Sequence, residues 1–509
     1  MSETGGVGGP EPSLRLSSGP GRWVLVATVL GSGLAGIDAT VVNVALPAIG
    51  ADLDADFVAL QWTVSAYALT LASFILLGGT LGDRFGRRRI FMIGVIWFAL
   101  ASLACGLSQN DVSLIAARTV QGVGAALLTP GSLAILQVSF RADDRARAIG
   151  AWSGLGGVAT AIGPLLGGWL VDVVSWRWVF LINLPLAALV IWLCVKHVPE
   201  TRDAAAQGTP IDWSGGLLGA VALAGLTFAL IESGRGPDVV VVALGIGLIA
   251  AAAFAVRERR APYPILPLRA FGSLQFSAVN AVTFLIYGGF GVVFFLLVVQ
   301  LQERSGFGPI AAGSALLPVT VLMLLLSSRS GQLASRIGPR LQLSVGPFVA
   351  AAGLLLLSGV GEGTHYLTGV LPGVLVFGLG LSILVAPLTA AALGAAPDDN
   401  AGMASGVNNA VARTGGLMAL AAIPALAGFG GAGANASDDG FGTAMWISAG
   451  VLVAGGVLAA LTVRNDVLEP EPTPTEQPEP ETQWLSHCGV GAPPLATATD
   501  RTGHPCAGG

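Results

Sequence analysis

Three charged residues interrupt long apolar runs of this chain: Asp38, Arg118 and Arg413. A charge in such a setting is expensive and usually marks an ion pathway, a proton relay or a ligand contact. A carboxylate that moves between an apolar environment and the neighbourhood of an arginine changes its affinity for protons. Asp38 and Arg118 therefore predict proton exchange, with a static ion pair between helices as the alternative. Arg413 could face an anionic or carbonyl-rich substrate, or it could cap a neighbouring helix.

The runs that hold these residues are long enough to span a bilayer. Of the 509 residues, 53% are hydrophobic and 11% are charged, whereas soluble domains carry about 25% charged residues. A helix of about 20 apolar residues crosses the hydrocarbon core. We predict an all-α polytopic membrane protein with fourteen transmembrane helices. The predicted spans lie near residues 22–46, 60–80, 91–108, 112–138, 146–171, 177–198, 213–232, 238–256, 276–300, 310–330, 342–360, 368–394, 402–429 and 441–463.

The basic residues favour one orientation of these spans. They concentrate in the connections that follow even-numbered spans, above all at 84–89, whereas the first odd-numbered connection, residues 50–57, contains Asp and no base. Basic connections remain on the cytoplasmic side of a membrane. Both termini are therefore expected in the cytoplasm.

This orientation places Asp38 and Arg118 at similar depths. Asp38 precedes Pro47, the expected outer end of its helix, by about 13 Å, and Arg118 follows the outer start of its helix by about 9 Å. Because the two helices run in opposite directions, both residues are expected in the outer half of the membrane. They could pair there.

The chain also repeats itself. The pattern of glycine and arginine at 79–88 returns at 331–340, and residues 142–151 resemble residues 397–406. Such repeats are typical of secondary transporters, which hold their substrate between the two halves. The predicted organisation is a disordered cytoplasmic leader (1–21), a six-helix half (22–198), two inserted central helices with flanking loops (199–275), a second six-helix half (276–463) and a disordered Pro/Glu-rich cytoplasmic tail (464–509).

The turn between the second and third spans combines glycines with clustered charges. Gly82 and Gly86 permit positive φ angles and close helix approach. Anchoring by positive charge is one interpretation, but it needs neither the glycines nor Asp83. A latch that holds the cytoplasmic side shut in one state is the functional interpretation. Its residues would be Gly79, Asp83, Arg84, Gly86, Arg87 and Arg88.

These motifs resemble a known family. "GGTLGDRFGRRR" in this turn resembles the signature of the major facilitator superfamily, and residues 114–132 resemble its fourth-span motif. Residues 157–170 are similar to its antiporter motif, and residues 37–47 and 176–185 are similar to its fourteen-helix drug:proton antiporters. The glycines of the antiporter motif predict close helix packing; the resemblance implies that this packing seals the cavity and favours export. The motif residues are Gly163, Pro164, Gly167 and Gly168.

Residues that line a substrate cavity are harder to identify from the sequence. The predicted spans at 310–330 and 402–429 contain no acid, which disfavours dicationic substrates. The aromatic residues of the ninth span, Phe284, Tyr287, Phe290, Phe294 and Phe295, could line a cavity or belong to the core or the lipid-facing surface. The candidate cavity residues are Asn43, Gln121, Tyr287, Asn408, Asn409 and Arg413.

Together these features predict efflux of amphipathic small molecules, such as drugs, antibiotics or toxic metabolites, by proton antiport with alternating access. A proton-coupled symporter for uptake is the alternative. We expect no enzyme activity, no cofactor, no metal site and no nucleic-acid partner. His487, Cys488, His504 and Cys506 in the tail lack the spacing of a zinc site. The expected setting is a monomer in the bacterial inner (plasma) membrane, with protons, lipid and a small amphipath as partners.

Overall fold

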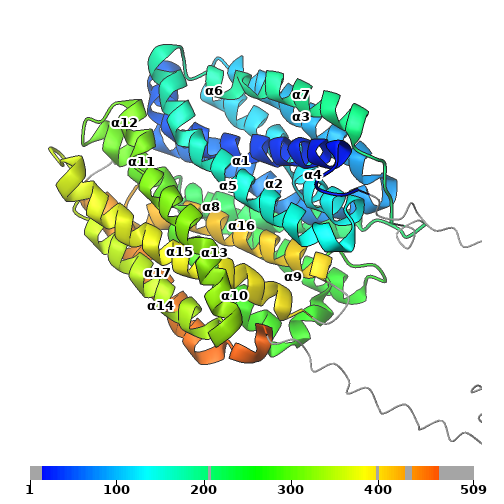
Figure 1. The fold of residues 1–509 in the computed structure, drawn as a ribbon. Coiled ribbons are helices and arrows are strands. Elements are labelled where there is room, and N and C mark those ends of the chain that lie inside the picture. Colours follow the sequence, from blue (N-terminus) through cyan, green and yellow to red (C-terminus); the bar gives the residue numbers. More distant parts are fainter. Residues whose placement is uncertain (1–13, 204–207, 397–400, 430–437, 469–509) are drawn as a thin grey trace, which may run out of the picture. The chain divides into compact units, whose positions relative to one another are not determined.

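A computed structural model describes residues 14–203, 208–396, 401–429 and 438–468 of the chain (Figure 1). The described residues form helices and connections, and no strand is present among them. Within the described ranges, fourteen helical segments are long and apolar enough to cross a membrane. The prediction of an all-α protein with fourteen transmembrane helices is therefore confirmed.

The first half contains six spans, the last of which is built from two helices in sequence. Its helices are α1 (Gly19–Leu53), α2 (Phe57–Phe85), α3 (Arg87–Gly106), α4 (Asp111–Ser139), α5 (Ala142–Val173), α6 (Trp178–Leu181) and α7 (Asn183–His197). The central pair follows as α8 (Trp213–Ile231) and α9 (Pro237–Arg260).

The second half also contains six spans, several of which are interrupted. Its elements are η1 (Leu268–Gly272), α10 (Leu274–Gly291), α11 (Val293–Glu303), α12 (Pro309–Ser314), α13 (Leu317–Ile337), α14 (Arg340–Leu357), η2 (Tyr366–Val370), α15 (Leu371–Gly394), α16 (Ala401–Leu426), α17 (Asp438–Thr462) and η3 (Asn465–Leu468).

Polar caps set the starts of several helices. The Asp56 side chain accepts a hydrogen bond from the Ala59 N–H at 2.8 Å at the start of α2. Asn110 and Ser113 form a reciprocal capping box at the start of α4. These side chains satisfy backbone N–H groups that have no partner within the helix. The apolar runs therefore become helices with defined ends.

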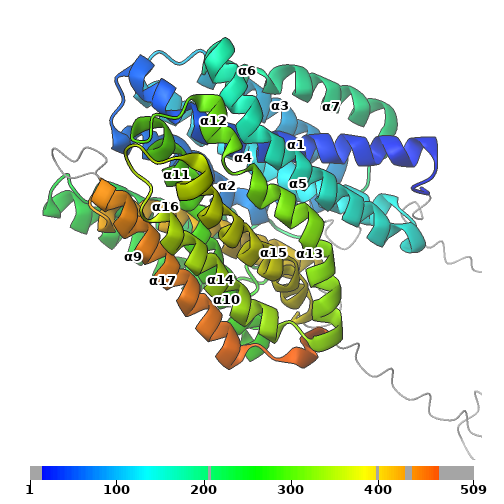
Figure 2. The ribbon, with the colours of Figure 1, turned by 60° about the vertical axis from the view of Figure 1, so that its left-hand side comes forward.

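The two halves repeat the same packing pattern. In the first half α4 packs against α2 and α3, and α1 packs against α5 and α7. In the second half α15 packs against α13 and α14, and α10 packs against α16 and α17. The repeat seen in the sequence is thus a repeat of helix packing (Figures 1 and 2). The central pair joins this frame through α8, which packs against α2 and α16.

Two differences from the expected boundaries concern the first helix. Helix α1 continues past Pro47 to Leu53, so Asp38 lies about 22 Å from its end and near its middle. The expected distance of about 13 Å to the helix end was therefore too short, and the position of Asp38 in the outer half of the membrane stays a prediction. A neighbouring helix also contacts the α1 backbone near this proline: Gln302 Nε2 donates to the Val44 carbonyl at 3.0 Å.

The second difference is at the start of the chain. Residues 1–13 lie outside the described residues, but residues 14–21 of the expected disordered leader have defined contacts. Leu14 and Ser139 share a backbone hydrogen bond of 3.2 Å, and the Leu16 N–H donates to Asp144 Oδ2 at 2.9 Å. The tail from residue 469, including its His and Cys residues, also lies outside the described part.

The halves contact each other along two seams. Helix α2 packs against α16, and α5 packs against α12. We call the side of the bundle with the α2–α3 turn the Gly86 side, and the side with the α1–α2 turn the Asp56 side. The α5–α12 seam lies toward the Asp56 side, because it joins the end of α5 to the start of the tenth span.

Candidate functional site

A buried ion pair lies between α1 and α4. Arg118 Nη1 contacts Asp38 Oδ2 at 2.5 Å, and the side chains are 1% and 0% exposed. The pairing expected from the sequence is therefore present. An ion pair removed from water in this way is costly unless its remaining donors and acceptors are satisfied.

Polar neighbours satisfy the carboxylate of Asp38. Its Oδ1 accepts hydrogen bonds from Gln121 Nε2 at 2.8 Å and from Asn183 Nδ2 at 3.1 Å. Both amide groups also donate to Ser102 Oγ, at 3.2 and 2.9 Å. Helices α1, α3, α4 and α7 thus each contribute one of these four residues. Gln121 was expected to line a substrate cavity; instead it is fully buried in this network.

Arg118 is held from the other side by α2. Its Nε donates to the Thr63 carbonyl at 3.0 Å, and its guanidinium carbon lies 4.2 Å from the centre of the Tyr67 ring. A cation over an aromatic face gains about 0.5–2 kcal/mol. These contacts hold the Arg118 side chain in place within the first half, and Asp38 balances its charge.

A cavity of about 510 Å³ adjoins Arg118 and lies between the halves. Most candidate cavity residues line it: Asn43, Tyr287, Asn408, Asn409 and Arg413. Four of the five aromatic residues of the ninth span also line it, namely Tyr287, Phe290, Phe294 and Phe295, whereas Phe284 does not. Asp38 is absent from the lining, so Arg118 separates its carboxylate from the cavity.

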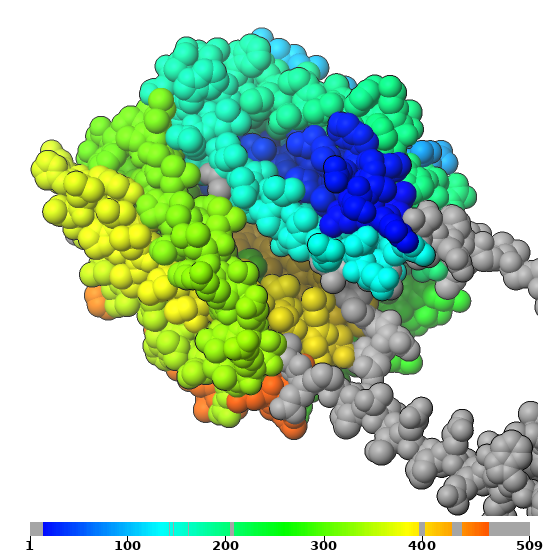
Figure 3. All heavy atoms as spheres, in the orientation of Figure 1, coloured from blue at the N-terminus to red at the C-terminus, as the bar shows by residue number. Residues whose placement is uncertain are grey.

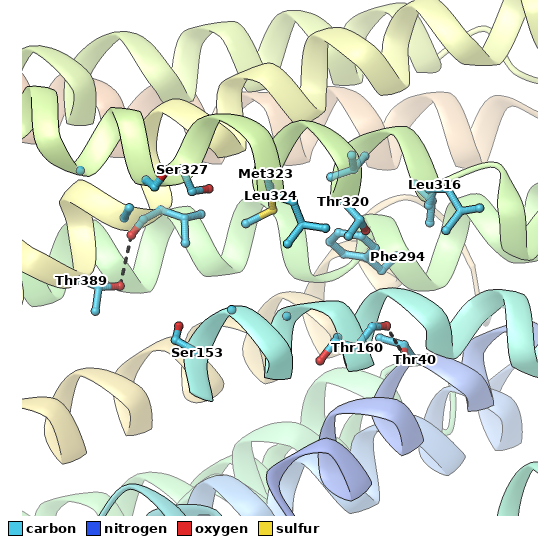
Figure 4. Close-up of a pocket in the computed structure, with 18 of the residues that line it drawn as sticks. Thr40, Ser153, Thr160, Phe294, Leu316, Thr320, Met323, Leu324, Ser327 and Thr389 are labelled. Carbon is cyan, nitrogen blue, oxygen red and sulfur yellow. Dashed lines mark hydrogen bonds between the residues drawn. The ribbon is translucent and has the colours of Figure 1, made fainter. Parts of the chain in front are cut away.

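A second hollow of about 850 Å³ continues from this cavity, because Thr40, Phe294, Thr389 and Leu393 line both. It lies between α5 and the helices α13 and α15. Figure 3 shows this hollow between the cyan residues of α5 and the green and yellow residues of the second half. In Figure 4, Ser153 and Thr160 of α5 face Thr320, Met323 and Ser327 of α13 across it.

Glycines close the seam between the halves on the Asp56 side. A Cβ atom at Gly168 would lie 2.7 Å from the Ile310 Cα, and one at Gly313 would lie 2.3 Å from the Pro164 carbonyl oxygen. Within the first half, a Cβ at Gly163 would lie 2.1 Å from Thr40 Oγ1. Gly167 is similarly close to Val41 on α1. The motif at 163–168 therefore packs α5 against both α1 and α12.

Comparison with known proteins identifies the family to which this architecture belongs. The sequence pattern of the Major Facilitator Superfamily matches residues 28–420. The chain belongs to the Major Facilitator Superfamily. As a superfamily member with fourteen membrane-length helices, it is a multi-pass membrane transporter.

Several curated superfamily relatives are similar over most of their length. A multidrug resistance protein of Mycobacterium tuberculosis is 37% identical over 78% of this chain and 74% of that protein. A tetracenomycin C resistance and export protein of Streptomyces glaucescens is 36% identical over 79% and 75% of the two chains. A puromycin resistance protein of Streptomyces alboniger is 34% identical over 86% and 90%.

Solved structures share the fold at lower identity. A peptide transporter in complex with sulfate has a TM-score of 0.65 and 15% identity, covering 86% of this chain and 94% of that one. This likeness concerns the superfamily fold alone.

The superfamily signature turn makes its contacts within the first half and with the connection that follows it. Arg87 Nη2 pairs with Asp83 Oδ1 at 2.7 Å, and the Arg84 guanidinium lies 5.3 Å from the centre of the Phe85 ring. Gly86 has a φ of +113°, a backbone conformation that glycine adopts readily, as expected from the sequence. Gly79 on α2 lies against Pro130 of α4. Within the described part of the chain, no hydrogen bond or ion pair joins residues 83–89 to the second half.

Glu200 is a partner of this turn that sequence reasoning missed. Its two carboxylate oxygens accept hydrogen bonds from the backbone N–H groups of Arg88 and Arg89, at 3.2 and 3.1 Å. A carboxylate at a helix N-terminus is favoured by the helix dipole. The second half has an equivalent: Asn465 Oδ1 accepts from the Arg340 N–H at 3.2 Å, next to Gly338 with a φ of +81°.

Asn183 and Ser102 were also missed at the buried ion pair. Both lie in apolar runs, where an uncharged polar residue gives a weak signal. The described residues include no group of three or more His, Cys, Asp or Glu that could hold a metal ion.

Proposed function

We propose that this chain exports amphipathic small molecules in exchange for protons. The observation that carries the proposal is the buried Asp38–Arg118 pair, which borders a cavity between two repeated halves. A secondary transporter of this architecture holds its substrate at that interface. The names of the relatives, which include multidrug resistance and antibiotic export, support outward transport of drug-like compounds.

The position of the hollow between α5 and α13 indicates which conformational state of the proposed transport cycle this structure represents. It lies toward the Gly86 side, where the arginine-rich connections are found. Because such connections favour the cytoplasm, this state faces inward, with both termini in the cytoplasm of a bacterial plasma membrane. The glycine seam at Gly168 and Gly313 then closes the outer side.

The geometry of the pair supports proton exchange. A proton on Asp38 removes the charge that balances Arg118, and the guanidinium then gains freedom to turn toward the cavity that it lines. Gln121 and Asn183 still offer hydrogen bonds to the neutral carboxyl. Substrate and proton therefore act on opposite sides of one arginine, which allows each to affect the other without a shared position.

The signature turn would take part in the opposite state. In the inward-facing state its charge pairs lie within the first half and with Glu200 in the connection that follows it. Closing the hollow would bring α5 and α13 together on the Gly86 side, where Asp83, Arg84 and Arg88 lie. We propose that these charges then latch the cytoplasmic side, as the clustering of glycines and arginines predicts.

Inverted membrane vesicles with an acidic interior test the proposal. Neutral, monocationic and anionic amphipaths are added outside, and substrate-induced proton release from the lumen is followed. Wild-type protein should release protons, and Asp38→Asn should abolish the release. Asp172→Asn, which changes an exposed carboxylate at the end of α5, is the matched control and should behave as wild type.

Two other outcomes would contradict the proposal. Release that survives Asp38→Asn would move the coupling site elsewhere. Substrate-dependent proton movement in the same direction as the substrate would indicate symport instead of exchange.

A further inference from the structure

Arg413 brings a positive charge into the cavity without a carboxylate to balance it. It lines the cavity from α16, and its Nε donates to Asn409 Oδ1 at 3.1 Å. No ion pair involving Arg413 is present among the described residues. A cation inside a membrane protein normally pairs with an anion or with backbone carbonyls, because an unbalanced charge is costly there.

The rest of the cavity offers no negative charge either. Among the described residues that line it, the charged ones are Arg118 and Arg413. Arg118 is already balanced by Asp38, which lies behind it. The phenol groups of Tyr67 and Tyr287 lie near Arg413. The net charge of the described cavity wall is therefore positive.

Aromatic rings form the wall next to this charge. The rings of Tyr287 and Phe290 lie 4.8 Å apart, and those of Phe290 and Phe294 lie 6.3 Å apart. Asn408 adds an amide, which is itself held by hydrogen bonds to Asn280 and Thr283. An aromatic wall beside a fixed charge suits a planar apolar group that carries a polar end.

The hollow that leads to the cavity is uncharged. Its described lining combines apolar side chains with hydroxyls, among them Thr160, Thr320 and Ser327, and it includes no Asp, Glu, Lys or Arg. A molecule passing through it thus meets its first charged group at the cavity. That group is a cation.

We propose that the transported amphipath carries an anionic group, such as a carboxylate, which binds Arg413 while its aromatic body lies against the Tyr287–Phe290–Phe294 wall. This inference rests on the proposed transport function and names its substrate class. The bidentate fork of an arginine matches a carboxylate. The substrate thereby supplies the counter-charge that the protein does not provide. Binding of Arg413 to Asn409 of its own helix argues against a role as the cap of a neighbouring helix.

Equilibrium binding to the purified full-length protein in nanodiscs of neutral lipid tests the charge preference. The probes are pyrene-carboxylate, pyrene-carboxamide and pyrenylmethylammonium, which share one aromatic body and differ in charge. Binding to protein-free nanodiscs is subtracted. We expect the carboxylate to bind at least tenfold more tightly than the ammonium probe.

Substitutions of Arg413 test whether this residue causes the preference for the carboxylate probe. Arg413→Gln should reduce the preference to twofold or less, and Arg413→Lys should retain part of it because the charge remains. Arg235→Gln, at an exposed arginine that pairs with Glu232 far from the cavity lining, should leave it unchanged.

Three results would overturn the inference: equal or tighter binding of the ammonium probe, a preference that survives Arg413→Gln, or no binding of the carboxylate. The measurement uses no proton gradient. It therefore separates failure of this inference from failure of proton-coupled transport, which only the vesicle experiment reports.

Discussion

At the scale of single residues, Asp38 depends on neighbours from two other helices, α4 and α7. Its carboxylate is fully buried, yet Arg118, Gln121 and Asn183 all bond to it. The network therefore positions the carboxylate as well as neutralising it. Removing one member should disturb the site without removing the charge itself.

Asn183→Leu tests this dependence. The change removes one donor to Asp38 and leaves a buried acceptor less satisfied, which costs about 1–3 kcal/mol. We expect a lower Tm in detergent and weaker substrate-induced proton release. In an Asp38→Asn background the same change should cost less, because the two groups act together. Additive losses of stability in the double variant would show that the contact has no energetic role.

The sequence alone could predict part of this site. Asp38 and Arg118 were identifiable because charges are rare in apolar spans. Asn183 and Ser102 could not be identified in that way, since uncharged polar residues are common in such spans and their contacts depend on helix rotation. The distance from Asp38 to the end of its helix was underestimated because Pro47 was taken as that end, although α1 continues to Leu53.

At the scale of helices, the seam between α5 and α12 depends on small residues. Gly168 has no room for a Cβ beside Ile310, whereas Gly156 on the same helix faces open space. A methyl group at position 168 must therefore push α12 away from α5. The seam should loosen on the Asp56 side.

Gly168→Ala should shift the population toward a state that is open on the Asp56 side. Spin labels at Asp172→Cys and Ala311→Cys would report a longer distance between α5 and α12 by pulsed electron resonance. The native tail cysteines are replaced by serine in all samples. Gly156→Ala is the matched control and should preserve the distance; an unchanged distance in Gly168→Ala would contradict the expectation.

At the start of α8, Asp212 should make the stability of the folded protein depend on pH. Burial opposes a charge on Asp212 and raises its pKa. Hydrogen bonds from the Ser214 hydroxyl and the Gly215 N–H, together with Arg257, outweigh burial and hold the pKa below its usual value. Asp212 therefore stabilises the folded state above its unfolded pKa of about 3.9, and this contribution disappears as the pH falls through the lower folded pKa.

Asp212→Asn should consequently lower the Tm at pH 7 and lower it less as the pH falls below about 4. Thermal unfolding of both proteins between pH 7 and pH 3 measures the difference. A difference that stays constant over this range would show that the charge of Asp212 does not stabilise α8.

At the scale of the whole molecule, the two interfaces between the halves differ: one is hollow, whereas α2 and α16 are in contact at the other. Helices α2 and α16 remain in contact from Gln61, which donates to the Leu420 carbonyl at 2.6 Å, to Leu76, which lies 3.4 Å from the Cβ position of Gly406. The α5 side opens between Ser153 and Ser327. Access from the Gly86 side should thus be confined to the α5–α13 side.

Thiol labelling tests this access. Ser153→Cys, at an exposed position that lines the hollow, should react with a membrane-impermeant maleimide supplied to the Gly86 side, in a protein whose two tail cysteines are replaced by serine. Cys105 and Cys194 are buried and can remain. Ser448→Cys, which lies at a fully buried position outside the hollow, should stay unlabelled. Equal labelling of the two variants would contradict an opening between α5 and α13.

The fourteen spans and the internal repeat were predictable because apolar length and repeated motifs are properties of the chain itself. The cavity was less predictable. Asn43 and Arg413 could be named as candidates, but Gln121 shares their polarity and lies in the buried network instead. Which side of a helix faces the cavity depends on contacts between the halves, and one sequence does not encode these contacts in a readable pattern.

The glycine seam has a consequence for how such a transporter evolves. Gly168 and Gly313 meet backbone atoms of the opposite half, so the seam separates without breaking a side-chain hydrogen bond at these glycines. A single added methyl group there would alter how long each conformation lasts, while Arg413 and the aromatic wall stay as they are. In the proposed mechanism, the rate of turnover and the choice of substrate would therefore depend on different residues. A population under antibiotic selection could adjust the speed of export through α5 without changing which compounds are carried.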